Sequence, residues 1–289
     1  MAGENLITGE MTIDGQRRTY GVRAADRPGT PLVLVLHGNQ TELDEPNPTD
    51  WSGFAERAAG WGITVVYPHG QGGCWADGRR STAADLAGVD DVGYLRALIG
   101  HCAEHYGTDP ERTLVAGISN GAFMAHRIAL EASDRVPVFA AVAGGLPADL
   151  SGLRPTHAVS AMLINGDSDP TVPIEGGYSR RRGPHGELRG RTLGLAESAA
   201  QWRAFDDCAE TGETVTTEQS RRYTSGPGAG GTRVVDWTVF GGGHTWPGIP
   251  IPGEWANYPG AAVSMEFHAT EEIWRFAEPL LIPADARKL

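Results

Sequence analysis

The stretch RTLVAGISNGAFMAHRIAL, residues 112–130, constrains the fold more than any other part of this 289-residue chain. It begins with a continuous apolar run, which is typical of a strand buried on both faces. It then breaks at Gly117, Ser119 and Gly121 and continues with apolar residues at helical spacing. Glycine accepts the backbone of a sharp turn, so the G-x-S-x-G pattern in this context predicts a strand-to-helix turn that presents a serine. A glycine-rich turn that happens to contain a serine is the alternative, and the rest of the chain decides between them.

Strand and helix patterns alternate along the whole chain. Further apolar runs occupy residues 31–38, 62–70, 138–145, 158–166 and 232–244, and helical patterns occupy residues 50–62, 90–107, 195–210 and 264–279. The segment 10–24 alternates around Asp14-Gly15, which predicts a two-residue hairpin. Strands that alternate with helices predict an α/β fold with a mostly parallel sheet and helices on both faces. Because no linker or repeat divides the chain, we expect one domain over residues 1–289.

Two glycine-rich polar segments, residues 71–88 and 174–192, fit neither pattern. Loops of this length in a compact domain are usually functional or mobile. The second segment carries a cluster of arginines in a chain whose formal net charge is −12: Arg180, Arg181, Arg182, Arg189 and Arg191. One of them is a candidate for contact with an anionic substrate group, and a solvated loop offset by nearby acids is the simpler interpretation.

Composition narrows the class of protein and of partner. Apolar residues make up 40% of the chain and charged residues 21%, as in soluble globular proteins. The acidic balance disfavours nucleic acid as a partner, since phosphate binding needs a basic face. No stretch approaches the roughly 18 apolar residues of a membrane span, and the start of the chain lacks a signal-peptide pattern, so we expect a cytoplasmic protein. The 3 cysteines, Cys74, Cys102 and Cys208, are too scattered to predict disulfides or a metal cluster.

Candidates for a base and an acid follow the serine along the chain. A serine hydroxyl becomes a nucleophile when a base takes its proton and a third group orients that base. His244, in FGGGHTWPG, follows the last apolar run, although His37 and His69 also end strands at the same expected edge of the sheet. Asp167 and Asp169 both follow the run at 158–166, and position alone does not choose between them. The order Ser, Asp, His is that of the α/β-hydrolase fold.

Five longer motifs point to a particular family within this fold: YPHGQGGCWADGRR, GVDDVGYLRALI, DPERTLVAGISNGAFMAHRIA, INGDSDPTVP and GGGHTWPG. With these motifs the chain resembles the polyhydroxybutyrate-depolymerase and feruloyl-esterase group, carbohydrate esterase family one, from about Leu32 to Trp274. Members of that group usually carry H-G-x-x-D-x-x-V-P, whose last aspartate is the catalytic acid. The resemblance therefore implies Asp169, which precedes Val172 and Pro173, as the acid.

The sequence also departs from the family pattern. Asn165 stands where a histidine is common, and LHGNQ at 36–40 replaces a loop that often has cysteine or further glycine after its HG. These changes bear on the substrate and on loop geometry. Many relatives are secreted and disulfide-bonded, and this chain resembles neither, which argues against a polymer-degrading role.

We therefore expect a serine esterase that acts on small acyl, feruloyl-type or acetyl-type esters through an acyl-enzyme. Ser119 would attack, His244 would take its proton and Asp169 would orient the imidazole. The backbone N–H groups of Asn120 and Asn39 are the expected oxyanion donors, with Gln40 as the fallback for the second.

Trp75, Trp246 and Gln40 are the candidate substrate-binding residues, although both tryptophans could instead pack the loops that carry them. The mechanism requires no metal or organic cofactor, and we expect a small-molecule ester as the partner. An intracellular tailoring enzyme that removes or transfers an acyl group such as acetate, and a non-catalytic binding module on the same scaffold, are the alternatives.

Overall fold

The computed structural model describes residues 6–40, 51–182, 186–209, 211–251, 257 and 260–282. Its strands are β1 (Ile7–Ile13), β2 (Gln16–Arg23), β3 (Thr30–Leu36), β4 (Thr64–Pro68), β5 (Thr108–Ile118), β6 (Val138–Val142), β7 (Ser160–Gly166), β8 (Gly176–Tyr178), β9 (Arg191–Leu193), β10 (Glu213–Thr216), β11 (Ser220–Thr224) and β12 (Val234–Val239). Its α-helices are α1 (Phe54–Trp61), α2 (Ala83–Leu86), α3 (Asp91–Tyr106), α4 (Asn120–Glu131), α5 (Leu195–Phe205) and α6 (Ala269–Leu281).

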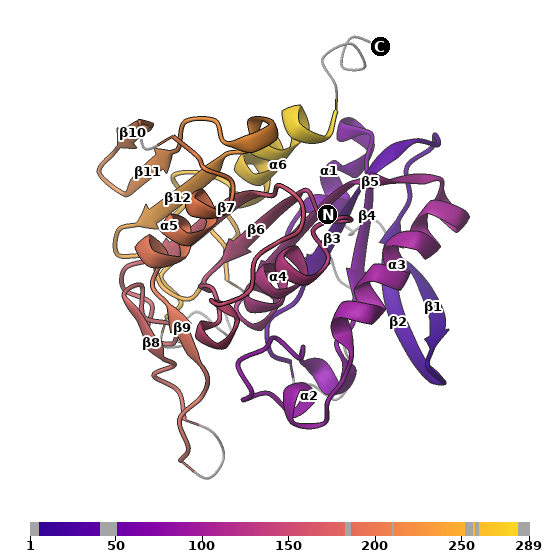
Figure 1. Ribbon diagram of the computed structural model, residues 1–289, viewed down its shortest axis with the longest axis horizontal. Helices are drawn as coiled ribbons and strands as arrows, with labels where there is room; N and C mark the ends of the chain where they lie inside the picture. The colour runs from indigo at the N-terminus through magenta and orange to yellow at the C-terminus, as the bar shows by residue number, and fades with distance from the viewer. Residues whose placement is uncertain are drawn as a thin grey trace.

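A ten-stranded sheet in the order β1-β2-β4-β3-β5-β6-β7-β12-β11-β10 forms the centre of the fold (Figure 1). The strands from β4 to β12 in this order pair in parallel, and antiparallel strands extend the sheet at both ends. Parallel strands must be covered on both faces, and β3 is accordingly buried along its whole length. Helices α3, α4 and α5 contribute to the core on one face, and α1 and α6 contribute to the core on the other.

The predicted alternation of strands and helices is confirmed, and so is the hairpin at Asp14-Gly15, where both residues have positive φ. Helix α1 begins after Gly53, later than the start of the helical pattern predicted at 50–62. The edge strands β10 and β11 were not predicted. Among the described residues, no helix is long and apolar enough to cross a membrane.

The two segments that matched no pattern contain short elements. Residues 71–88 hold a 3-10 turn (Gln71–Gly73) and α2. Residues 174–192 contribute β8 and most of β9, which pair antiparallel as an arm apart from the main sheet. In Figure 1 the arm and α2 both project from the lower part of the molecule.

Candidate active site

Ser119 lies between β5 and α4 with φ 55° and ψ −118°. A non-glycine residue in such a sparsely populated region of φ and ψ costs about 1–3 kcal/mol and persists only when its surroundings hold it there. The Ser119 N–H donates to the Val142 carbonyl oxygen at 3.0 Å, and its own carbonyl accepts from the N–H groups of Ala122 and Phe123 at 2.9 and 3.1 Å. The neighbouring strand and the first turn of α4 therefore hold the strained serine between them.

The motif glycines are required by close backbone approaches. A Cβ on Gly117 would lie 2.2 Å from the carbonyl oxygen of Gly121, and a Cβ on Gly121 would lie 2.2 Å from that of Leu36. A Cβ on Gly38 would be 3.4 Å from the Cβ of Ser119. The loop after β3 therefore lies directly beside the serine, and a chance glycine-rich turn does not explain this packing.

Asp169 and His244 are hydrogen-bonded to each other. Asp169 Oδ2 accepts from His244 Nδ1 at 2.7 Å, and Oδ1 accepts from the N–H groups of Thr171 and Val172 at 2.7 and 2.9 Å. The Asp169 side chain is fully buried, whereas that of His244 is 14% exposed. With the carboxylate accepting at Nδ1, the neutral imidazole carries its proton there and leaves Nε2 as an acceptor.

Sheet topology brings the predicted nucleophile, base and acid to one edge. Ser119 follows β5, Asp169 follows β7 and His244 follows β12, and these strands run parallel. The carboxyl edge of an open α/β sheet is where such folds place their sites. Asp167, the positional alternative to Asp169, is exposed, and its Oδ1 accepts from the N–H of Gly241 at 2.7 Å. It joins two turns and makes no contact with the imidazole.

The loop that carries His244 packs closely against its neighbours. The N–H of His244 donates to the Gly260 carbonyl oxygen at 2.9 Å. Gly260 has φ 98°, and a Cβ there would lie 2.7 Å from Pro170 Cγ. From the arm, Arg180 Nη1 donates to the backbone carbonyl of Asp169 at 2.9 Å. Arg180, one of the arginines considered for substrate contact, therefore supports the backbone turn that carries Asp169.

The predicted oxyanion donors belong to the two backbone segments that meet at the serine. Asn120 is the first residue of α4, where a backbone N–H has no partner within its own helix and lies at the positive end of the helix dipole. Asn39 is exposed in the loop beside Gly38. Gln40, the fallback, donates its backbone N–H to the carbonyl oxygen of Gly73 at 2.8 Å. Because its N–H already has an acceptor, Gln40 is the weaker candidate for the second donor.

His37 and His69 hold loops in place. Gly70 N–H donates to His37 Nε2 at 2.9 Å, so Nδ1 carries the proton and donates to the Gly38 carbonyl at 2.6 Å. Burial lowers the pKa of His37 to about 4. His69 contacts Thr19 Oγ1 at 3.0 Å, and burial lowers its pKa as well.

The tryptophans lie in the core, so the prediction that Trp75 and Trp246 wall a substrate pocket was wrong. Trp75 is 0% exposed, and its Nε1 donates to the His37 carbonyl at 3.0 Å. Trp246 is 4% exposed, and its Nε1 donates to Thr270 Oγ1 at 3.0 Å. Burial of the large rings, with each N–H satisfied inside, leaves little surface for a substrate.

Sequence reasoning missed the residues that hold the Asn120 side chain. Its amide bonds to the backbone of Trp75 and to the carboxylate of Asp77, both in the segment 71–88. The motif CWADGRR was the available signal, because an acid and an arginine lie two residues apart in it. Among the described residues, no group of His, Cys, Asp and Glu side chains is arranged to hold a metal ion.

Comparison with known proteins yields esterases and a depolymerase, although no family model matches the chain. NocK of Nocardia uniformis subsp. tsuyamanensis, named as an esterase, is 30% identical over 259 residues, which cover 84% of this chain and 74% of NocK. Poly(3-hydroxyalkanoate) depolymerase C of Paucimonas lemoignei is 28% identical over 256 residues, covering 80% of this chain but 58% of that protein. An acetylxylan esterase of Coprinopsis cinerea is 24% identical, covering 77% of this chain and 63% of its own length.

Solved structures share the fold. The acetyl xylan esterase from Aspergillus awamori matches with a TM-score of 0.58 at 15% identity, over 89% of this chain and 100% of that one. The native structure of sOPH matches with a TM-score of 0.52 at 16% identity, over 92% and 91%. At these identities the likeness carries the architecture alone.

Proposed function

The chain belongs to the α/β-hydrolase esterases, among relatives named esterase, poly(3-hydroxyalkanoate) depolymerase and acetylxylan esterase, and on that premise we propose that Ser119, Asp169 and His244 form its catalytic triad. The observation that carries the proposal is the 2.7 Å hydrogen bond between Asp169 and His244, at the sheet edge that also holds Ser119 in its strained turn.

Ester hydrolysis follows from these positions. Ser119 Oγ attacks the ester carbonyl carbon while His244 Nε2 takes its proton, and the negative charge moves to the carbonyl oxygen. The backbone N–H groups of Asn120 and Asn39 stabilise that oxyanion. The bond to the alcohol breaks as His244 returns the proton to the departing oxygen. Water then attacks the acyl-enzyme by the same route, which releases the acid and restores Ser119.

The substrate of this mechanism is a small ester with an acetyl-type, feruloyl-type or other short acyl group. The name of one curated relative, an acetylxylan esterase, supports the acetyl-type group. Whether the enzyme hydrolyses the ester or transfers its acyl group depends on whether water or an alcohol attacks the acyl-enzyme. Adding an alcohol to the assay and measuring the new ester distinguishes the two reactions.

Hydrolysis of p-nitrophenyl esters from acetate to octanoate tests the proposal, with the protein compared with Ser119→Ala and His244→Ala. We expect turnover of short chains by the wild type and losses of several orders of magnitude in both variants. A fluorophosphonate should label the wild type and not Ser119→Ala. A wild type that neither hydrolyses any of these esters nor takes the label would refute the proposed triad.

A further inference from the structure

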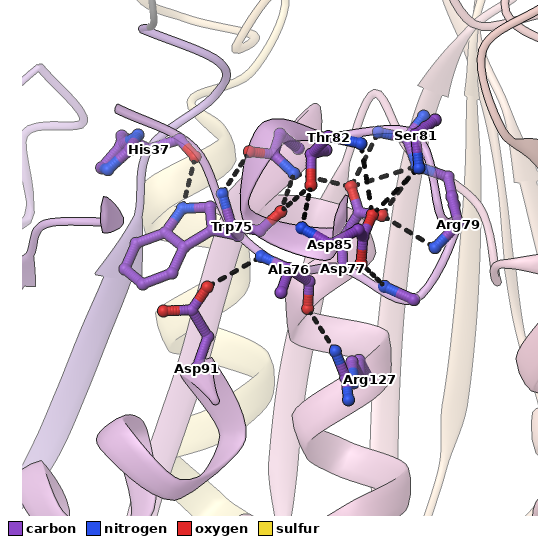
Figure 2. Close-up of polar contacts among 12 residues, drawn as sticks. His37, Trp75, Ala76, Asp77, Arg79, Ser81, Thr82, Asp85, Asp91 and Arg127 are labelled. Carbon is purple, nitrogen blue, oxygen red and sulfur yellow. Dashed lines mark hydrogen bonds and ion pairs between the residues drawn. The ribbon is translucent and has the colours of Figure 1, made fainter. Parts of the chain in front are cut away.

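The segment 70–77 contacts both loops that carry the proposed oxyanion donors. On one side it meets Asn120: the Trp75 N–H donates to Asn120 Oδ1 at 2.7 Å, and Asn120 Nδ2 donates to the Trp75 carbonyl at 3.1 Å. The same Nδ2 donates to Asp77 Oδ2 at 2.6 Å. Asn120 is buried, and these bonds satisfy both ends of its side-chain amide. Figure 2 shows this segment passing from Trp75 to Asp77 beside the helices.

On the other side the segment meets the loop after β3. The Trp75 indole N–H donates to the His37 carbonyl, as Figure 2 shows, and the Gly70 N–H donates to His37 Nε2. His37 Nδ1 in turn donates to the carbonyl oxygen of Gly38. That carbonyl belongs to the planar peptide whose N–H is that of Asn39. The segment therefore links the two peptides that would donate to an oxyanion.

Asp77 is the charged centre of this link. Its side chain is fully buried, and besides Asn120 it accepts from Arg79 Nη2 at 2.7 Å and from Arg79 Nε at 3.1 Å. The Arg79 guanidinium also lies 3.7 Å from the centre of the Phe123 ring, on α4. Burial raises the pKa of Asp77, and the charge of Arg79 acts in the opposite direction. A buried carboxylate needs such a partner to remain charged.

Adjacent helices hold the rest of the segment. The Ala76 N–H donates to Asp91 Oδ2 at 2.7 Å, and Arg127 Nη1 donates to the Ala76 carbonyl at 2.6 Å. Asp91 comes from α3 and Arg127 from α4, one on each side of Ala76 in Figure 2. The backbone beside Asp77 is therefore fixed independently of Asn120, so Asp77 can act as an anchor for it.

We propose that Asp77 is a positioning residue of the oxyanion hole that acts through the side chain of Asn120. An ionised carboxylate only accepts hydrogen bonds, so Asp77 selects the amide orientation in which Asn120 Nδ2 faces it and Oδ1 faces the Trp75 N–H. A fixed side chain holds the Asn120 Cα, and the Ser119 turn then determines the direction of the Asn120 backbone N–H. The proposal rests on the function proposed above.

The expected effect lies in the transition state. A donor that meets negative charge only as the oxyanion forms raises kcat and leaves substrate binding nearly unchanged. Loss of one such donor typically lowers turnover about 10²- to 10³-fold. A misaimed donor should cost less than a missing one, so we expect Asp77→Asn to lower kcat by about 10- to 100-fold and to change KM by less than about twofold.

Asp85→Asn is the matched control. Asp85 and Asp77 both lie in the polar segment 71–88. Asp85 accepts from the N–H groups of Gly78 and Ser81 at 2.9 and 3.2 Å, but it makes no hydrogen bond to Asn120. Its substitution loosens the segment without touching the amide. We expect its kcat to stay within about threefold of the wild type, since the bonds that change join Asp85 to backbone N–H groups of the loop and none of them reaches Asn120.

The deciding readout is affinity for a trifluoromethyl ketone, which forms an anionic hemiketal on an active serine. Its inhibition constant should rise in Asp77→Asn by the same factor by which kcat falls, and should stay near the wild-type value in Asp85→Asn. Equal losses of kcat in both variants, or an unchanged inhibition constant in Asp77→Asn, would overturn the proposal. A wild type that a fluorophosphonate does not label would instead reject the proposed function itself.

Asn120→Ala tests the same link if Asp77→Asn does not fold, because alanine keeps the backbone N–H and removes only the anchored side chain. It should reproduce the lowered kcat and the weakened ketone affinity. Where Asp77→Asn does fold, combining it with Asn120→Ala should change kcat little further. Residues that act through one another are non-additive in this way. Wild-type kcat in Asn120→Ala, or losses that multiply in the double variant, would contradict the proposed link.

Discussion

Replacing Asp169 by asparagine should move the ring proton of His244 from Nδ1 to Nε2 while leaving the fold unchanged. Asparagine Oδ1 can still accept from the N–H groups of Thr171 and Val172, as Asp169 does at 2.7 and 2.9 Å. Its NH2 group then occupies the place of Oδ2, 2.7 Å from His244 Nδ1. Since an amide nitrogen only donates, Nδ1 becomes the acceptor and the ring proton moves to Nε2. An Nε2 that carries a proton does not take one from Ser119.

The magnitudes follow from this exchange. The number of hydrogen bonds at the carboxylate is conserved, so the free energy of unfolding should change by about 1 kcal/mol or less. Loss of the productive tautomer in a serine triad lowers kcat by about 10⁴-fold, which corresponds to about 5.4 kcal/mol of activation free energy. KM should stay within about threefold, because the aspartate is buried behind the imidazole and does not meet the substrate.

Steady-state kinetics with p-nitrophenyl acetate and urea unfolding measure the two quantities separately. Asp167→Asn is the matched control, since Asp167 follows the same strand and its Oδ1 accepts from the Gly241 N–H, away from the imidazole. The control should keep kcat within about threefold of the wild type, because asparagine Oδ1 can still accept from the Gly241 N–H and the Ser168 hydroxyl. The reasoning is refuted if Asp169→Asn stays within tenfold of the wild type, or if both variants lose activity equally.

Further outcomes test the packing, the pH response and the donors. Gly121→Ala should lower the free energy of unfolding by about 1–3 kcal/mol in urea, because its Cβ would lie 2.2 Å from the Leu36 carbonyl oxygen. Gly100→Ala, on α3 with open space around it, should instead raise it by about 0.5–1 kcal/mol, and equal effects would contradict the packing argument. Burial lowers the pKa of His37 to about 4 and that of His126 to about 3. Below pH 6.5 the unfolded chain therefore binds protons that the folded chain does not, and stability should fall as the pH falls toward 4, by about 3 kcal/mol for His37 alone. In His126→Leu the free energy of unfolding, measured by urea titration, should fall less steeply between pH 6.5 and 4. An unchanged dependence on pH would refute the claim that buried His126 contributes to the fall. Asn39→Ala keeps the backbone donor, so kcat should fall by less than about fivefold, and a loss comparable to that of a missing donor would mean that its side chain acts directly.

Local patterns were enough to predict the strand, turn and helix around Ser119. The glycines at 117 and 121 signal a turn in the sequence for the same reason that they are needed in the structure, since a Cβ at either would meet a backbone carbonyl. Local patterns could not choose between Asp167 and Asp169, because both follow β7. What distinguishes them is that the Asp169 carboxylate faces His244, and the spacing of residues along the chain does not encode such a tertiary contact.

Exposed strands and buried loops were the features that residue patterns misrepresented. Strand β10 is exposed along its whole length and lacks apolar alternation, so its place depends on pairing with β11, and that of β11 on pairing with β12. Trp75 and Trp246 stand in glycine-rich stretches that look like surface loops, yet both rings are buried. An aromatic residue in such a loop gives no periodic signal that tells inward from outward.

Polarity in the segment 71–88 was a sign of burial. A loop that enters the core has backbone N–H and carbonyl groups that neither a sheet nor a helix satisfies, so side chains must do it. Asn120 bonds both backbone groups of Trp75, and Asp91 and Arg127 bond those of Ala76. The same reasoning sorts the arginines of the second segment. Arg180 donates to the Asp169 carbonyl and supports the proposed acid, whereas Arg182, Arg189 and Arg191 form no ion pair with any residue that the structure describes. To test whether an arginine contacts an anionic group on the substrate, these three are therefore the residues to substitute. Arg180 is left intact because it supports the turn of Asp169.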